Sequence, residues 1–550
     1  MRPISIPLKL SDIDTNLSNG TYVIPDFQRD FVWDIDQSAQ LLDSWIKGYP
    51  LGAFILWTTD EELCSIKQIG NVVVYHKKDD TAKTTYILDG QQRITSIFAA
   101  IKGLTIKNKS YADIIINLDA ELTDYETDIV TVRTDDATFV NISFAKLYEN
   151  DLRYIVQNYP NHIDKISAIQ KKLNELDFPS IKIDSVNIDV ATDIFTRLNT
   201  GGKKLTPFEI MTAKTYKPDV FNLVEKAKEC RDNLNVAYKS IITDGDLLKL
   251  VALCVKGGTT KKDQLSLTRN EMINTFDDVV AALNSAIAFC INSLKIPVGN
   301  MIAYAPPLYL YVYFFYKYNQ SHSLESPSKK QQDYLIDYYW RSVMNFRFAR
   351  GTDSKTANDT KNVMDKILAD EVPEQIAVTM SVDAFIANGY FGQKTAYIKG
   401  MIGLLMSLAP KSISKNSLVS FDQNWVSKSD KNNYHHFFPL KMVGQVWTNE
   451  PVNNICNIIL QDASTNQVDI GNRRPSDYIN EFVQSNSELR KTLEEHLIND
   501  IDDYGIMSDD FNVFIKKRAV AFIEEIKSRL VVTSSDAIDS EIKQVQPVVI

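Results

Sequence analysis

The sequence is poor in the residues that build disulfide frameworks and zinc knuckles. Its 550 residues contain five cysteines, and no two of them form a CxxC pair. A disulfide scaffold needs closely spaced cysteines and a zinc knuckle needs paired ones, so neither is suggested. We expect reduced thiols that lie in the core. The five are Cys64, Cys230, Cys254, Cys290 and Cys456.

The sequence also lacks an excess of positive charge and long hydrophobic runs. Sixty basic and seventy acidic side chains give a net charge of −10, which argues against a nucleic-acid-binding coat but allows a local basic groove. The N-terminus has no apolar signal segment, and the most apolar stretch, Met301–Tyr316, is interrupted by Pro306 and Pro307. We expect a soluble, cytoplasmic protein with no membrane partner.

What is present favours a multidomain α+β protein, because 550 residues exceed what one core organises. Residues 1–215 alternate β-like runs with amphipathic segments, which predicts an α/β or α+β domain. Residues 216–415 show helical spacing and predict a helical connector. A polar linker at 411–420 would precede a last domain at 421–530, and residues 531–550 would form a fraying tail.

Individual elements can be predicted from these patterns. Amphipathic spacing predicts helices over 37–47 and up to a stop at Gly103, and further helices at Asp246–Val255 and Gln332–Val343. The aromatic run Leu308–Tyr318 could be a base-stacking surface, but such stripes are far more often core. Strands are predicted at Ala53–Trp57, Val72–Tyr75, Thr85–Leu88, Ile114–Leu118 and Ile181–Ile183.

Three N-terminal segments have a residue order that packing alone does not explain: Ile24–Trp33, Ile87–Thr95 and Asp193–Ile210. In the second, an apolar strand ends in Asp89-Gly90 and a helix follows at once. This turn would present backbone N–H groups to an anion, with Arg93 as a phosphate contact and Asp89 placed to hold a metal ion or orient water. An isolated Asp-Gly is usually only a turn. The co-occurrence of three segments favours a site.

The third segment combines a helix, a glycine exit and a new helix with Thr206 as N-cap and Pro207 at its first position. Together the segments resemble the ParB/sulfiredoxin-like domain of the GmrSD-type restriction enzymes, over roughly residues 15–215. The resemblance implies binding and hydrolysis of a nucleoside triphosphate, GTP or ATP, coupled to sensing of modified DNA. Since no GxxxxGK segment followed by Ser or Thr occurs, this would not be P-loop chemistry. The implied site comprises Gln28, Arg29, Asp89, Gly90, Gln91, Gln92, Arg93, Arg197 and Asn199.

A second constellation lies near the C-terminus. Only six histidines occur, and two are adjacent in Asn433–Pro439. Asn457, Asn466 and the segment Gly471–Tyr478 follow. This order resembles an HNH (His-Me finger) nuclease, a β-hairpin and a helix that clasp one divalent metal. Phosphodiester cleavage needs a base for water and a cation for the phosphate, which these residue types supply.

The resemblance implies His436 as general base, His435 and Asn466 as metal ligands and Asn457 as the residue that braces the hairpin. Arg473 and Arg474 would suit phosphate binding. Many relatives carry a carboxylate where His435 stands, and since imidazole is a poorer ligand for Mg²⁺ than for Mn²⁺, either metal stays open. The alternative is a structural pair of strand histidines, one buried and one exposed.

Both halves together predict an endonuclease with NTPase activity that senses modified or foreign DNA, in phage defence, and cuts or nicks it. The partners would be modified phage DNA and a nucleotide, and a homo-oligomer stays open. One rival is a non-catalytic ParB-like DNA-binding or clamp protein with a degenerate finger, which would show no metal-dependent activity. Another is an HNH nuclease directed at RNA, which side-by-side digestion would reveal.

Overall fold

The structure is a computed structural model, and the chain divides into two compact units. The N-terminal unit comprises residues 1–226 with 268–270, and the C-terminal unit comprises 227–267 with 271–550. The structure describes residues 3–25, 31–60, 63, 65–74, 83–122, 126–184, 190–191, 194, 206–217, 219–322, 325–391, 395–421, 434–439, 452–461 and 470–539.

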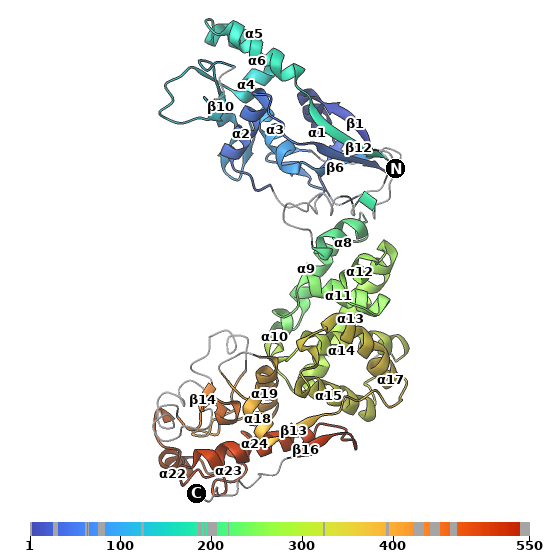
Figure 1. Ribbon diagram of the computed structural model, residues 1–550, viewed down its shortest axis with the longest axis vertical. Coiled ribbons are helices and arrows are strands. Elements are labelled where there is room, and N and C mark those ends of the chain that lie inside the picture. The colour runs from blue at the N-terminus through green and yellow to red at the C-terminus, as the bar shows by residue number, and fades with distance from the viewer. Residues whose placement is uncertain are drawn as a thin grey trace, which may run out of the picture. The chain divides into compact units, whose positions relative to one another are not determined.

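A five-stranded mixed sheet forms the centre of the N-terminal unit (Figure 1). In spatial order its strands are β1 (Ile4–Leu8), β12 (Phe178–Asp184), β3 (Phe54–Thr59), β6 (Thr84–Asp89) and β2 (Tyr22–Val23). β12 runs parallel to β3 and β2 parallel to β6, whereas β1 with β12 and β3 with β6 are antiparallel. The predicted mixed α+β character of this region is confirmed.

Smaller sheets and helices surround the five-stranded sheet. In the described part of this unit the other strand pairings are antiparallel: β9 (Ile114–Asn117) lies between β10 (Val130–Val132) and β11 (Asn141–Ser143), β4 (Gln68–Ile69) pairs with β5 (Val72–Val73), and β7 (Thr105–Ile106) pairs with β8 (Lys109–Ser110). The helices include α1 (Leu10–Ser18), α2 (Ile35–Ile46), α3 (Gln91–Lys102), α4 (Phe144–Glu149), α5 (Leu152–Asn158), α6 (Ile163–Glu175) and α8 (Pro207–Thr215).

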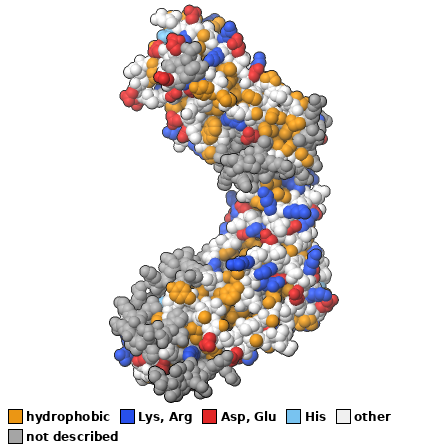
Figure 2. All heavy atoms as spheres, viewed as in Figure 1, with side chains coloured by type: hydrophobic (Ala, Val, Ile, Leu, Met, Phe, Trp, Pro, Cys, Tyr) orange, Lys and Arg blue, Asp and Glu red, His pale blue; other side chains and the backbone are white. Residues whose placement is uncertain are grey.

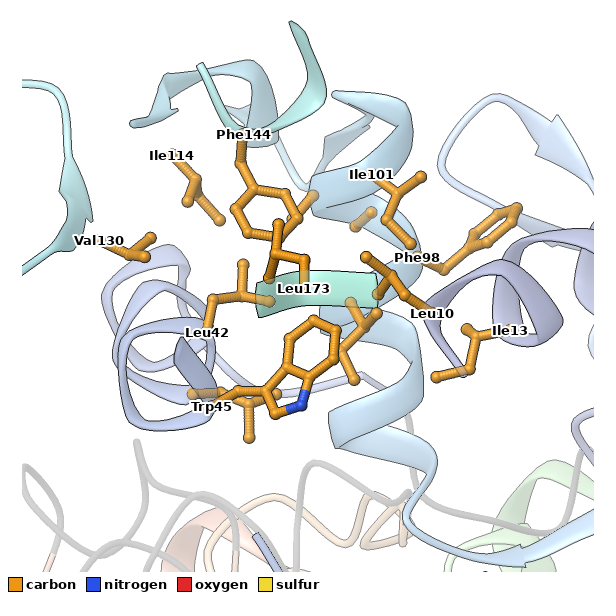
Figure 3. Packing of buried hydrophobic residues seen from close by; sticks show 14 of the residues in the cluster. Leu10, Ile13, Leu42, Trp45, Phe98, Ile101, Ile114, Val130, Phe144 and Leu173 are labelled. Atoms are coloured by element: carbon orange, nitrogen blue, oxygen red, sulfur yellow. The ribbon is translucent and has the colours of Figure 1, made fainter. Parts of the chain in front are cut away.

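Alternation along β3 assigns its side chains to two separate cores. Phe54 and Leu56 belong to the core shared with α1, α2 and α3, whereas Ile55 and Trp57 belong to a smaller core on the other face. Figure 3 shows the larger core, in which Leu42 and Trp45 of α2, Leu173 of α6 and Phe144 of α4 point toward one another. The Trp45 ring stacks on Phe178 of β12 at 4.4 Å between centroids. This packing fixes the strand and helix that meet at Asp89-Gly90.

The first part of the C-terminal unit is helical, as predicted. α14 (Ala305–Ser321) contains the aromatic run Leu308–Tyr318, which is buried apart from Lys317. The expectation that this run is core is therefore confirmed. The other helices from residue 223 to residue 407 include α9 (Leu223–Asn233), α10 (Val236–Lys239), α11 (Asp244–Lys256), α12 (Lys261–Leu265), α13 (Arg269–Asn292), α15 (Lys329–Met344), α16 (Thr352–Asp359), α17 (Asp365–Leu368), α18 (Val382–Asn388) and α19 (Ala396–Ser407).

The remainder of the C-terminal unit combines a short hairpin with helices. Its described elements are β14 (Tyr434–His436), a 3₁₀ turn at Ile455–Asn457, β15 (Ile458–Leu460), α22 (Pro475–Ser485), α23 (Leu489–Glu494) and α24 (Phe511–Lys527). β14 and β15 are antiparallel, with His435 opposite Ile459. α24 packs on α18, so the helical region and the hairpin region share one unit.

Two segments that we expected to be loose are ordered parts of this unit. In the expected linker 411–420, Ile413 is buried and the Lys411 carbonyl accepts a hydrogen bond from His496. In the expected tail, residues 537–539 form β16 (Ala537–Asp539), which pairs in parallel with β13 (Thr379–Ser381). Polar composition indicated exposure, but partners far away in sequence order both segments. Residues 540–550 lie outside the described part.

Candidate functional site

The predicted turn at Asp89-Gly90 is present in the N-terminal unit. β6 ends at Asp89, and α3 begins at Gln91 with Gly90 as its N-cap. Gly90 has φ +97°, and a Cβ atom there would lie 2.3 Å from Cδ1 of Phe54. Glycine is therefore required both by the left-handed backbone and by the close ring. The first N–H groups of a helix have no acceptor within the helix, so the start of α3 suits an anion.

Arg93 is engaged by the protein itself. Its guanidinium donates to the carbonyls of Leu51 (2.5 Å) and Ala53 (3.1 Å) and to a carboxylate oxygen of Asp89 (3.0 Å). Burial lowers the pKa of the guanidinium, opposed by the Asp89 carboxylate. Arg93 thus ties the start of α3 to the segment before β3. The Asp89 side chain is 39% exposed, whereas that of Arg93 is 17% exposed, so Asp89 is the more accessible of the two.

The two glutamines of the motif differ in their contacts. The Gln92 amide oxygen accepts hydrogen bonds from the backbone N–H groups of Val32 (2.9 Å) and Trp33 (3.3 Å). Gln92 thereby joins the second segment, Ile87–Thr95, to the end of the first segment, Ile24–Trp33. Gln91 is 5% exposed, and its amide nitrogen has no hydrogen-bond partner among the described residues. A buried amide donor costs free energy unless it is bonded, so Gln91 is the motif residue with spare capacity for a ligand.

The other predicted residues of this site are Gln28, Arg29, Arg197 and Asn199, and they lie outside the described residues. Thr206 does cap α8, and its side chain accepts from the Glu209 N–H while Pro207 occupies the first turn. The predicted helix start in the third segment is confirmed. Of the predicted N-terminal site residues, the structure therefore describes the consecutive run Asp89–Arg93.

In the C-terminal unit, His435 and His436 are neighbours on β14. His435 is 5% exposed, and His436 is partly exposed. Neighbouring strand residues point to opposite faces, so this distribution alone also fits a structural pair. What distinguishes the two interpretations is the surroundings of His436 and of the turn that follows β14.

His436 is held by an asparagine. Its Nε2 lies 2.9 Å from the side-chain oxygen Oδ1 of Asn453. Because an amide oxygen only accepts, Nε2 carries the proton in this arrangement and Nδ1 keeps a free lone pair. Burial lowers the pKa of His436 below its usual value, and the bond to Asn453 opposes this. The imidazole is thus a neutral acceptor near pH 7, which is the state a general base needs.

Asn457 braces the turn that follows β14. It is fully buried, its amide oxygen accepts from the Phe438 N–H, and its amide nitrogen donates to the Phe438 and Val452 carbonyls. The Tyr478 hydroxyl of α22 donates to the Phe437 carbonyl at 2.6 Å. The hairpin and the following helix are therefore joined by backbone-directed hydrogen bonds.

The predicted phosphate and metal groups are placed only in part. Arg473 pairs with Glu481 at 2.5 Å, and the Arg474 side chain is 66% exposed and lies 4.0 Å from Asp509. Asn466, the second expected metal ligand, lies outside the described residues. Within the described part of the chain, no group of three or more His, Cys, Asp and Glu side chains could hold a metal ion.

Two residues of this region were not found from the sequence. Asn453 holds His436, but nothing in the sequence distinguishes it from Asn454. Arg518 of α24 is fully buried and donates to the carbonyls of Cys456 and His496. It therefore fixes the backbone just before Asn457. The periodic pattern of the α24 sequence does not indicate that the Arg518 side chain is buried in the core.

Comparison with known proteins supports the N-terminal part of the interpretation. Residues 10–216 match the family described as GmrSD restriction endonuclease, N-terminal domain. The resemblance of this region to the N-terminal domain of GmrSD restriction enzymes is thus confirmed. An uncharacterized protein of Methanocaldococcus jannaschii is 22% identical over 593 residues, which cover 94% of this chain and 98% of that protein. No described helix is long and apolar enough to cross a membrane.

Proposed function

We propose that this protein is an NTP-dependent or NTP-regulated endonuclease that recognises modified or foreign DNA and cuts or nicks it by phosphodiester hydrolysis. The match of residues 10–216 to a restriction endonuclease family implies DNA as the partner. Acidic and basic side chains are interspersed on the face seen in Figure 2, so DNA contact would rest on local groups rather than on net charge.

The arrangement around His436 carries the nuclease part of the proposal. A neutral imidazole with a free Nδ1, a hydrogen-bonded Asn453 behind it and a braced turn at Asn457 follow the chain order of an HNH finger. α22 then packs against the same turn through Tyr478. A structural histidine pair would need none of these three supports.

The metal that this chemistry calls for would be held by His435 together with Asn466, and it would stabilise the charge on the phosphate and the leaving oxygen. Imidazole nitrogen and amide oxygen are donors that Mn²⁺ accepts. The described residues do not by themselves complete such a centre.

Nδ1 of His436 accepts a proton from water while the water oxygen forms a bond to phosphorus. The bond from phosphorus to the leaving sugar oxygen breaks, and that oxygen takes up a proton from solvent. Asn453 keeps Nε2 protonated, so the imidazole stays oriented as it becomes charged. Arg473 and Arg474 would hold the flanking phosphates.

At the N-terminal site, the nucleotide phosphates would lie against the turn at Gly90 and the start of α3. Asp89 would hold a metal ion or orient the attacking water, and the Gln91 amide would donate to the ligand. Arg93 supports this turn through Leu51 and Ala53. Phosphate contact by Arg93 would need one of these bonds to give way.

The test is cleavage of plain and modified phage DNA, with RNA alongside, in the presence and absence of each NTP and of Mg²⁺ or Mn²⁺. His436→Ala should lower the cleavage rate by about 10² to 10⁴ and leave DNA binding intact. His322→Ala, an exposed histidine, is the matched control. Undiminished cutting by His436→Ala would show that the finger is not the nuclease and would favour a binding protein.

A further inference from the structure

The C-terminal unit contains an open pocket of about 540 Å³ that the proposed function does not use. Its wall comes from the residue before α14, from the chain that follows α15, from the end of α18 and from the start of α19. Four aromatic residues contribute to the lining: Tyr304, Phe346, Tyr390 and Tyr397. The volume lies in the range of sites for small ligands, which is about 300–1,000 Å³.

Two of these rings are exposed in a way that is rare in this protein. Phe346 is 39% exposed and Tyr390 is 50% exposed. In the described part of the chain, Tyr49 of the N-terminal unit, at 45%, is the only other aromatic side chain with comparable exposure. Aromatic rings are normally buried because their removal from water is favourable. Figure 2 shows hydrophobic side chains at the surface in the region of α18 and α19.

Phe346 is held in an unusual backbone conformation. Its φ is +49°, in the left-handed region that bulky residues avoid. Its ring stacks on Tyr397 of α19, with centroids 5.4 Å apart and planes 17° apart. A strained residue that persists in a fold points to a function for the conformation. Here the conformation aligns one exposed ring with a buried one.

The pocket is connected by hydrogen bonds to the residue that holds His436. The Phe391 N–H donates to the Asn453 carbonyl at 2.9 Å, and the Ile455 N–H donates to the Gly389 carbonyl at 2.8 Å. Gly389 has no room for a side chain, since a Cβ atom would lie 2.5 Å from Oδ1 of Asn454. The wall that carries Tyr390 is therefore locked to the segment that carries Asn453.

The chemistry of the lining selects a flat and uncharged group inside the pocket. None of the described lining residues is charged, and hydrogen-bonding groups are supplied by Asn388 and Thr395. Arg350 follows the lining residue Ala349, is exposed, and makes no ion pair with any residue that the structure describes. Stacked rings with a few polar groups and a cation outside suit a nucleobase and its phosphate.

We propose that this pocket binds one base of the nucleic-acid substrate, stacked on Phe346 and Tyr390, beside the strand that His436 cleaves. The base would come from a single strand or be rotated out of a duplex, because a paired base cannot enter a pocket. That the base belongs to a nucleic-acid substrate rests on the proposed nuclease function. The arrangement of the pocket residues does not depend on that function.

Binding and crosslinking test this directly. Full-length His436→Ala protein is mixed with a single-stranded oligonucleotide that carries one 5-iodouracil, irradiated and mapped by peptide mass spectrometry. The crosslink is expected at Tyr390 or Phe346. Tyr390→Ala in the same background should weaken binding about 5-fold to 150-fold, as expected for the loss of one base stack. Tyr390→Phe keeps the ring and should bind as the parent does.

Tyr49→Ala removes an exposed ring from the other unit and should leave binding unchanged. Thermal unfolding of Tyr390→Ala checks that the fold persists, which its exposure predicts. A crosslink elsewhere, or equal binding by Tyr390→Ala and the parent, would overturn the pocket assignment, even if His436 proves to be the general base of the cleavage reaction. Conversely, cutting by His436→Ala would overturn the nuclease assignment and leave the binding result standing.

Discussion

Asp89 and Arg93 lie four residues apart at the N-terminal site and have different tasks in the structure. Replacing Asp89 by Ala removes an accessible carboxylate and should abolish NTP turnover with little change in stability. Replacing Arg93 by Ala removes donors from two backbone carbonyls and one carboxylate. This should lower the free energy of unfolding by about 1–3 kcal/mol. Turnover assays and denaturant titrations of both variants measure the two effects.

Gln170→Ala is a suitable control for the stability effect, because it also removes a side-chain bond to a backbone carbonyl, that of Leu147, outside the site. Its turnover should equal that of the parent. If Asp89→Ala retains turnover, the N-terminal turn is not a hydrolytic site. If Arg93→Ala is as stable as the parent, its bonds to Leu51 and Ala53 contribute nothing.

The state of His436 makes a prediction about pH. Burial lowers its pKa below 6.5, so the neutral base should persist somewhat below pH 6.5 and kcat/KM should fall only as the pH drops through the lowered value. Asn453→Asp places a negative charge beside the imidazole, which stabilises its protonated form. The acidic limb of the pH profile should then move to higher pH.

Asn499→Asp adds the same charge at an exposed position of the same unit and should leave the profile in place. The profiles of parent and variants are compared by initial cleavage rates from pH 5 to pH 8. A limb that does not move in Asn453→Asp would mean that another group limits the rate.

His496 predicts an acid sensitivity of folding rather than of catalysis. It is fully buried, and burial lowers its pKa from 6.5 to about 4. The unfolded chain takes up a proton near pH 6.5 while the folded protein does not, so the free energy of unfolding falls as the pH drops from 6.5. The loss approaches about 3 kcal/mol near pH 4.

His496→Gln keeps a donor for the Lys411 carbonyl but does not titrate. Its free energy of unfolding should therefore vary less between pH 6.5 and pH 4 than that of the parent, as measured by urea titration at each pH. His322→Gln, at an exposed position, should retain the parent's pH dependence. An identical dependence in parent and His496→Gln would refute the buried neutral state.

At the scale of elements, the last strand of the described chain is anchored by a buried ion pair. Arg341 of α15 donates to both carboxylate oxygens of Asp536, at 2.6 and 2.9 Å, and the two side chains are 2% and 0% exposed. The Arg341 guanidinium also donates to Asp337 and to the Val531 carbonyl. These bonds position β16 beside β13.

Asp536→Ala would leave the buried Arg341 short of a partner. The free energy of unfolding should fall by about 3–5 kcal/mol, the usual cost of breaking a buried pair. Asp502→Ala removes an exposed partner of Arg490 and should cost at most about 1 kcal/mol. Equal effects in the two variants would mean that β16 does not stabilise the unit, and that residues 531–539 behave as the tail expected from composition.

At the scale of the whole molecule, the proposed sensor and nuclease should be thermodynamically coupled. Nucleotide should change the affinity for modified DNA, and DNA should change the affinity for nucleotide by the same factor, typically about 5-fold to 150-fold. Binding titrations with each ligand alone and with both measure this factor. Asp89→Ala and His436→Ala separate the two sites. Full independence would favour two tethered enzymes over a sensor and an effector.

Much of the fold could be predicted because it depends on local periodicity. The strands at β3, β6, β9 and β12 and the helices α2, α3, α11 and α15 follow from the spacing of apolar residues, which a folded core must bury. The caps at Gly103 and Thr206 follow from local backbone chemistry. The order at 411–420 and 531–539 did not follow, because its partners are remote in sequence.

The sequence by itself determined which residues could carry chemistry: Asp89-Gly90 at a strand end, adjacent histidines near the C-terminus, and Asn457 after them. The reason is that turn geometry and donor types are local properties. Only the tertiary structure decided their contacts. In the folded protein Arg93 donates to the backbone carbonyls of Leu51 and Ala53, and Asn453 contacts His436. Arg518 is buried and bonded to the Cys456 carbonyl next to Asn457, and the aromatic pocket is hydrogen-bonded to the segment that carries Asn453. Such pairings depend on long-range packing, because residues separated by tens of positions meet only when the cores of both units have formed.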